Sequence, residues 1–211
     1  MQQGMLFHSL YAPESGVYVE QFSCTLQGSL NTAAFERAWR YLLERHTILR
    51  TAFVGQALKE PIQVVYQQAP LDIHQEDWRE LDAAQRQIKL QAFMAADRQR
   101  GFDLAQAPLM RLALFRVAET AHEFVWTYHH VLLDGWSMPL LLTEFMTSYE
   151  TFCGDRDGRA RESARQSSLN RPVPLPPARP YRDYIVWLRK QDLGKAEAFW
   201  RRTLQGLTAP T

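Results

Sequence analysis

The spacing of apolar positions changes along the chain, and each change predicts a different element. Between residues 18 and 26 apolar and polar positions alternate, which is typical of a half-buried strand, and this strand is expected to end at Gly28. Beyond Asn31, a residue suited to capping a helix, the apolar positions recur at helical spacing. This stripe is expected to pack into the core and consists of Phe35, Ala38, Trp39, Leu42 and Leu43.

The remaining segments show one or the other of these two periods. Strands are predicted at residues 49–54, 62–66, 71–74, 110–117 and 123–128. Helices are predicted at residues 82–100, 181–191 and 195–204. The last two strands are joined by a short polar turn, so we expect them to pair with each other in antiparallel fashion. Strands interspersed with helices predict an α/β sandwich.

Composition adds little about partners. The 211 residues carry a formal net charge of +1 and the pI is near 7.8, so neither nucleic acid nor a membrane is expected as a partner. No apolar run reaches the length of a membrane span, and the first residues do not resemble a secretion signal. Cys24 and Cys153 form no CxxC pattern, which favours reduced thiols and a cytoplasmic location.

One stretch, FVWTYHHVLLDGWSMPLLL, combines a strand end, a tight loop and a helix start. The predicted strand runs into His129 and His130, and the chain then breaks at Asp134 and Gly135, a dipeptide that favours a turn. Helical spacing follows, with Ser137 placed to cap the helix. Because side chains alternate across a strand, the two histidines must point to opposite faces, and only one of them can enter a given cavity.

These residues support more than one kind of chemistry. One imidazole can exchange a proton near neutral pH while the other holds the backbone. Asp134 can steer an imidazole by a hydrogen bond, or it can pair with a cation that fixes the loop, and the spacing leaves both open. A buried core histidine is the plainer alternative. A metal site is not expected, because adjacent strand histidines diverge and the other four histidines show no ligand spacing such as HExxH.

The segment HHVLLDGWS, from His129 to Ser137, resembles the HHxxxDG signature of the condensation domains of nonribosomal peptide synthetases, which belong to a superfamily similar to chloramphenicol acetyltransferase. The trailing Trp136 and Ser137 are typical of the condensation subtype. Three further segments resemble the first, second and fourth motifs of that family, in the same order: MQQGMLFHSL, RHTILRTAF and YRDYIVWL. Together the four motifs span nearly the whole chain.

The resemblance implies a fold and a set of residue roles. It implies a two-layer sandwich like that of chloramphenicol acetyltransferase, with a mixed sheet flanked by helices in a single lobe. His130 is implied as the catalytic base or positioning group. The implied supporting residues are His129, Asp134, Gly135 and Arg50, with Trp136 and Ser137 at the substrate channel. Arg50 is expected to pair with Asp134, and Arg45 is the alternative partner.

The resemblance also implies a reaction and its partners. Members of the family join a carrier-bound acyl or peptidyl thioester to the amine of a second carrier-bound aminoacyl group. The substrates arrive on phosphopantetheine arms of donor and acceptor carrier domains, and the domain itself binds no cofactor. An epimerisation-type domain, which removes a proton from carbon, is the alternative within the family.

Complete condensation domains contain two lobes. Residues 1–211 are therefore expected to form an N-terminal lobe without its C-terminal lobe, with a mobile loop or linker at 154–180. On this view the active parent contains the second lobe or adjacent synthetase modules, and the exposed lobe face favours self-association. The alternative, from a different functional class, is a noncatalytic fragment or binding lobe.

Overall fold

The computed structural model describes residues 2–11, 16–55, 62–154 and 173–206. These residues fall into two compact units, 1–178 and 179–211. The first unit carries the sheet and the histidine pair. The second contains the helices α5 (Tyr181–Arg189) and α6 (Leu193–Thr203), close to the two helices predicted there.

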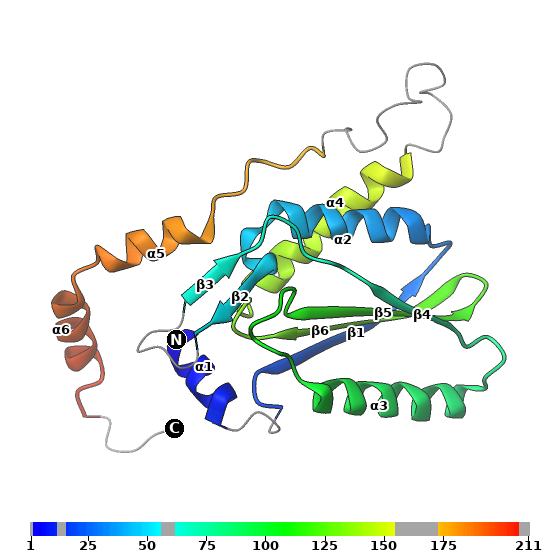
Figure 1. Cartoon of the computed structure of the whole chain (residues 1–211), viewed down its shortest axis with the longest axis horizontal. Helices are drawn as coiled ribbons and strands as arrows, with labels where there is room; N and C mark the ends of the chain where they lie inside the picture. Colours follow the sequence, from blue (N-terminus) through cyan, green and yellow to red (C-terminus); the bar gives the residue numbers. More distant parts are fainter. Residues whose placement is uncertain (1, 12–15, 56–61, 155–172, 207–211) are drawn as a thin grey trace. The chain divides into compact units, whose positions relative to one another are not determined.

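A four-stranded mixed sheet is the centre of the first unit (Figure 1). Its strands, in spatial order, are β1 (Val19–Gln27), β6 (Ala121–His129), β5 (Met110–Ala118) and β4 (Ile73–Asp77). The strands β1, β6 and β5 pair antiparallel, and β4 pairs parallel with β5. The predicted strand from 18 to 26 and the predicted antiparallel pair are confirmed.

Helices cover both faces of this sheet. Figure 1 shows α2 (Thr32–Arg45) and α4 (Ser137–Gly154) on one side and α3 (Ala83–Arg100) on the other. Alternate residues of β6 face each layer: Phe124 and Trp126 join the cluster that includes α2 and α4, whereas Val125 joins the cluster against α3. The mixed sheet flanked by helices is thus confirmed, and the histidine pair lies at the end of its second strand.

The α2 stripe shows why the sequence folds this way locally. The Asn31 side chain accepts a hydrogen bond from the Ala34 N–H at 3.1 Å and so caps the helix, as predicted. All five stripe residues are buried, with at most 4% of each exposed. Trp39 packs against Trp126 of β6 with ring centroids 5.1 Å apart, which fixes the helix over the central strands.

The other elements of the first unit are smaller. They are the helix α1 (Gln2–Tyr11), the 3-10 helix η2 (Thr47–Arg50), and the antiparallel pair β2 (Thr51–Val54) and β3 (Ile62–Val65). The strand predicted at 49–54 therefore begins as a 3-10 turn. The strand predicted at 71–74 begins later, at Ile73, and Leu71 lies ahead of it in the core cluster.

The expected linker at 154–180 is described only at its two ends. Residues 155–172 lie outside the described part of the chain, and Gly154 is the last residue of α4. Val173, however, is only 7% exposed and belongs to the core cluster, and Leu175 packs against that cluster. The end of the expected linker is therefore anchored to the first unit, because its few apolar residues reach the core.

Candidate active site

The two histidines differ in burial. His129 is the last residue of β6 and is 3% exposed, whereas His130 begins the following turn and is half-buried. The His130 ring is therefore not sealed inside the core. Its Nδ1 atom is buried and has no hydrogen-bond partner among the described residues.

The His129 ring is fixed at both of its nitrogen atoms. Its Nδ1 accepts a hydrogen bond from the Val131 N–H at 3.1 Å, and its Nε2 lies 3.1 Å from the Ser9 hydroxyl of α1. Burial, together with the neighbouring His130, lowers the pKa of His129 to about 4. His129 is thus a neutral ring at neutral pH and supports the turn.

The backbone around His130 is held from the start of the chain. The His130 N–H donates to the Tyr18 carbonyl at 2.7 Å, and the Gln2 side-chain amide donates to the Val131 carbonyl at 3.0 Å. Tyr18 has a φ of +69°, unusual for a residue with a large side chain. Its hydroxyl lies 2.9 Å from Nδ1 of His8, so α1 also holds the residue that supplies this carbonyl acceptor.

Asp134 begins α4. Its carboxylate accepts hydrogen bonds from the Ser137 N–H at 2.8 Å and the Ser137 hydroxyl at 2.6 Å. The Ser137 hydroxyl is the main cause that lowers the pKa of Asp134 below its usual value. The prediction that Ser137 caps this helix is therefore wrong. Ser137 is already the first helical residue, and the aspartate three positions earlier satisfies its N–H.

The expected pair between Arg50 and Asp134 is not formed. The Arg50 guanidinium donates to the carbonyls of Leu43 and Glu44, each at 3.1 Å, and to that of Tyr66. These bonds tie the end of α2 to the residue after β3. Asp134 is exposed and its carboxylate is occupied by Ser137, so the geometry gives Arg50 a structural role at a different joint.

Arg45, the alternative partner, also bonds elsewhere. Its Nε donates to Glu144 of α4 at 3.0 Å, and His46 Nε2 lies 2.6 Å from the same carboxylate oxygen. The guanidinium also donates to the Pro176 carbonyl. These contacts join the end of α2 to α4 within the first unit.

Gly135 and Trp136 lie beyond Asp134 on the surface. A Cβ atom added at Gly135 would meet no heavy atom within 4 Å, so packing among the described residues does not require glycine there. Trp136 is 87% exposed. Of the two predicted channel residues, Trp136 is thus exposed on the first unit, whereas the Ser137 hydroxyl is bonded to Asp134.

Four residues that contact the histidine turn were not predicted from the pattern of the sequence. They are Gln2, Ser9, Tyr18 and Val131. Gln2 and Ser9 belong to the segment recognised as the first motif, but nothing in their spacing indicates a partner more than 100 positions away. Only the motif resemblance itself could have drawn attention to them.

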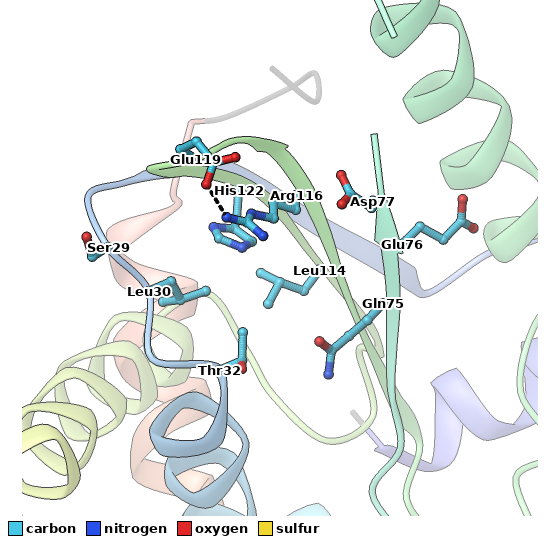
Figure 2. Close-up of a pocket in the computed structure, with 10 residues that line it drawn as sticks. All are labelled: Ser29, Leu30, Thr32, Gln75, Glu76, Asp77, Leu114, Arg116, Glu119 and His122. Atoms are coloured by element: carbon cyan, nitrogen blue, oxygen red, sulfur yellow. Dashed lines mark hydrogen bonds and ion pairs between the residues drawn. The ribbon is translucent and has the colours of Figure 1, made fainter. Parts of the chain in front are cut away.

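A hollow of about 500 Å³ lies at the other end of β6 (Figure 2). It is lined by His122, Leu114 and Arg116 of the sheet, by Gln75 of the edge strand, and by Thr32 at the start of α2. Seven residues of extended chain separate His122 from His129, a span of about 23 Å. This hollow is therefore distinct from the histidine turn.

The described residues contain neither a metal site nor a membrane-spanning helix. No group of three or more His, Cys, Asp or Glu residues among them is placed to hold a metal ion. None of the helices in the described ranges is both long and apolar enough to span a bilayer.

The whole chain matches a known family. The family model for the condensation domain matches residues 1–211. The chain is 48% identical over 212 residues to a protein of the linear gramicidin synthase of Brevibacillus parabrevis, covering 100% of this chain and 4% of that protein. It is 35% identical over 211 residues to surfactin synthase subunit 3 of Bacillus subtilis, covering 100% of this chain and 15% of that protein.

Solved structures show the same fold. A starter condensation domain of rhizomide synthetase matches 99% of this chain and 47% of its own length, with a TM-score of 0.72 and 21% identity. The first condensation domain of the calcium-dependent antibiotic synthetase matches 77% of this chain and 38% of its own length, with a TM-score of 0.65 and 23% identity. The chain thus spans less than half the length of each of these structures and a small part of the curated relatives.

Proposed function

The chain belongs to the condensation-domain family of nonribosomal peptide synthetases, and on that premise we propose that it forms part of a site for amide bond formation. The reaction joins a carrier-bound acyl or peptidyl thioester to the amine of a carrier-bound aminoacyl group. The carbonyl carbon forms a bond to nitrogen, the carbon–sulfur bond breaks, and the free thiol of the donor arm is released. The observation that carries the proposal is the half-buried His130 ring on a turn whose flanking peptides are both held.

His130 is the residue to which we assign the proton chemistry. Attack by the amine builds positive charge on nitrogen and negative charge on the thioester oxygen. We assign the proton-accepting role to the Nε2 atom, because Nδ1 is buried. The ring then removes the proton from nitrogen, or orients the amine and stabilises the charged intermediate. His129 is not assigned this role, because both of its nitrogen atoms are occupied.

The two carriers and a second lobe are part of the same proposal. The matched rhizomide synthetase domain is about twice as long as this chain. We propose that the remaining half of such a domain closes the site opposite the histidine turn, where Gly135 and Trp136 are exposed. Phosphopantetheine arms then deliver the donor and the acceptor to His130 as substrates.

Replacement of His130 by alanine tests the assignment. In the intact synthetase that contains this chain, with donor and acceptor carriers loaded, condensation should fall by about a hundredfold to ten-thousandfold, the range for loss of a general base. A smaller loss indicates that orientation carries more of the rate. The measurement is the mass of the product on the acceptor carrier over time. His74→Ala, which removes a half-exposed histidine on β4, should leave the rate unchanged.

Two outcomes would contradict the proposal. Undiminished amide formation by the His130→Ala protein would remove His130 from the chemistry. Absence of amide in the wild-type protein, with deuterium uptake from heavy water at the Cα of the donor residue, would reassign the site to epimerisation. The two results differ in product mass, so they are distinguished in the same assay.

A further inference from the structure

Ser9 of α1 contacts His129 across 120 positions of sequence. The Ser9 hydroxyl oxygen lies 3.1 Å from Nε2 of His129 and 2.8 Å from the Met5 carbonyl, one helical turn earlier. On the other side of the ring, Nδ1 of His129 lies 3.1 Å from the Val131 nitrogen. His129 is 3% exposed, and its contact to the Val131 N–H is buried.

The protons in this chain of bonds can be assigned from chemistry. A backbone N–H only donates, so Nδ1 of His129 must accept and cannot carry a proton. A neutral imidazole has one N–H, which must then lie on Nε2 and donate to the Ser9 oxygen. The Ser9 hydroxyl proton is directed to the Met5 carbonyl, a backbone acceptor. Every member of the chain is thus satisfied in one arrangement only.

The arrangement fixes the backbone on both sides of His130. The peptide before it is held by its N–H donating to the Tyr18 carbonyl at 2.7 Å. The peptide after it is held by the Val131 N–H donating to His129. The Val131 carbonyl then accepts from Gln2 at 3.0 Å. Of these contacts, only the one to His129 depends on which nitrogen of a ring carries the proton.

We propose that Ser9 is a positioning residue, which accepts the Nε2 proton of His129 and fixes the ring whose Nδ1 holds the turn that presents His130. This inference rests on the proposed function, since it concerns the placement of the same histidine. Without the Ser9 oxygen, the Nε2 proton loses the acceptor that holds it, and the ring can turn away from its position. The Val131 N–H then loses its partner, and the peptide after His130 is released.

The matched control is Ser148→Ala. Ser148 lies in α4 and its hydroxyl donates to the Glu144 carbonyl at 2.7 Å, again one helical turn earlier. It therefore reproduces the helical hydrogen bond of Ser9 without a contact to His129. Ser9→Thr is the conservative variant, because it retains a hydroxyl at the same position.

The first experiment detects which ring nitrogen of His129 carries the proton. In the 211-residue chain with ¹⁵N-labelled histidine, NMR should show His129 protonated on Nε2 and not on Nδ1. Ser9→Ala should give shifted His129 ring signals, faster hydrogen exchange at the Val131 amide, and altered His130 ring signals. Ser9→Thr and Ser148→Ala should each retain the wild-type signals. A wild-type His129 protonated on Nδ1, or a Ser9→Ala protein with unchanged ring and amide signals, would overturn the proposal.

The second experiment measures turnover in the intact synthetase with loaded carriers. Ser9→Ala should lower kcat by about tenfold with little change in KM, because the reacting ring is misplaced while carrier binding is retained. Ser9→Thr should restore most of the rate. If wild-type protein forms no amide, the proposed function fails while the NMR result stands. If amide forms and Ser9→Ala turns over normally, the positioning role alone is refuted.

Discussion

His129 and His130 are adjacent in sequence but have different environments. His129 is buried, and both of its ring nitrogens have partners, whereas His130 is half-buried and its Nδ1 has none among the described residues. A buried polar atom without a partner is uncommon in native proteins, and a catalytic role is one of its explanations. The contrast therefore agrees with the assignment of chemistry to His130 and of support to His129.

The lowered pKa of His129 predicts a pH dependence of stability. The unfolded ring binds a proton below a pH of about 6.5, whereas the folded ring does so only below about 4. The unfolded state thus holds more protons in this interval, and stability must rise with pH across it. The contribution is complete above a pH of about 6.5 and falls by roughly 3 kcal/mol as the pH decreases to 4.

Denaturant unfolding of wild-type and His129→Gln proteins over this pH interval measures the effect. The variant should be less stable at pH 7, and its stability should depend less steeply on pH, by about one proton. His122 has a pKa lowered mainly by burial and contributes in the same direction, but it is present in both proteins and cancels. Equal pH slopes for the two proteins would show that the His129 ring is not held in its neutral form.

At the scale of elements, the side chain of Asp134 caps the start of α4, shortly after the histidine turn. Asp134 accepts two hydrogen bonds from Ser137, which is the first residue of the helix. The last turn of α2 is joined to α4 by Arg45, His46 and Glu144. The loop between β6 and α4 is thus fixed at the helix start, and not by an arginine as the motif resemblance implied.

Replacement of Asp134 therefore tests a helix cap. Asp134→Ala should reduce the free energy of unfolding by about 1 kcal/mol, whereas Asp134→Asn, which retains an acceptor oxygen, should lose only a few tenths. Because the pKa of Asp134 is lowered in the fold, its ionic contribution is present above a pH of about 3.9 and is lost below it. Thermal unfolding at pH 7 measures the loss of stability in each variant, and its comparison with pH 3 measures the ionic contribution of Asp134. Equal losses in the two variants at pH 7 would contradict the capping role.

At the scale of the whole molecule, the second unit has exposed apolar side chains. Neither α5 nor α6 buries any residue among those described. In this second unit, the large apolar side chains with 43% or more of their surface exposed are Tyr184, Val186, Trp187, Leu188, Leu193, Phe199, Trp200 and Leu204. An apolar surface of this kind usually marks an interface. We therefore expect another lobe or another copy of the chain to cover it.

Light scattering of the isolated chain tests this expectation. The mass should exceed 24.5 kDa and rise with protein concentration. Combined Trp187→Ser and Trp200→Ser replacement should lower it toward the monomer value. Ile88→Ser removes a side chain of α3 that is 67% exposed, and it should leave the association unchanged. A monomer at all concentrations would show that α5 and α6 do not drive association.

Local geometry let the sequence predict most elements of the fold. Strand and helix periods depend on neighbours two, three or four positions apart, so the α2 stripe, the β5–β6 pair and the strand end at the histidines could all be inferred. The sequence also places His130 at the end of the strand, and in the structure it lies in the turn after β6. The sequence by itself therefore determined where the histidine turn lies and which elements flank it.

The tertiary structure decided which side chains meet at that turn. Hydrogen-bond partners depend on distances that chain folding creates, and no spacing indicates that Ser9 lies beside His129 or that Arg50 bonds carbonyls of Leu43 and Glu44. Asp134 differs, because its partner Ser137 lies only three positions away and the contact is a local feature of the helix start. Periodicity and helix caps are local properties of the chain, whereas the choice of a distant polar partner is settled only when separate segments pack.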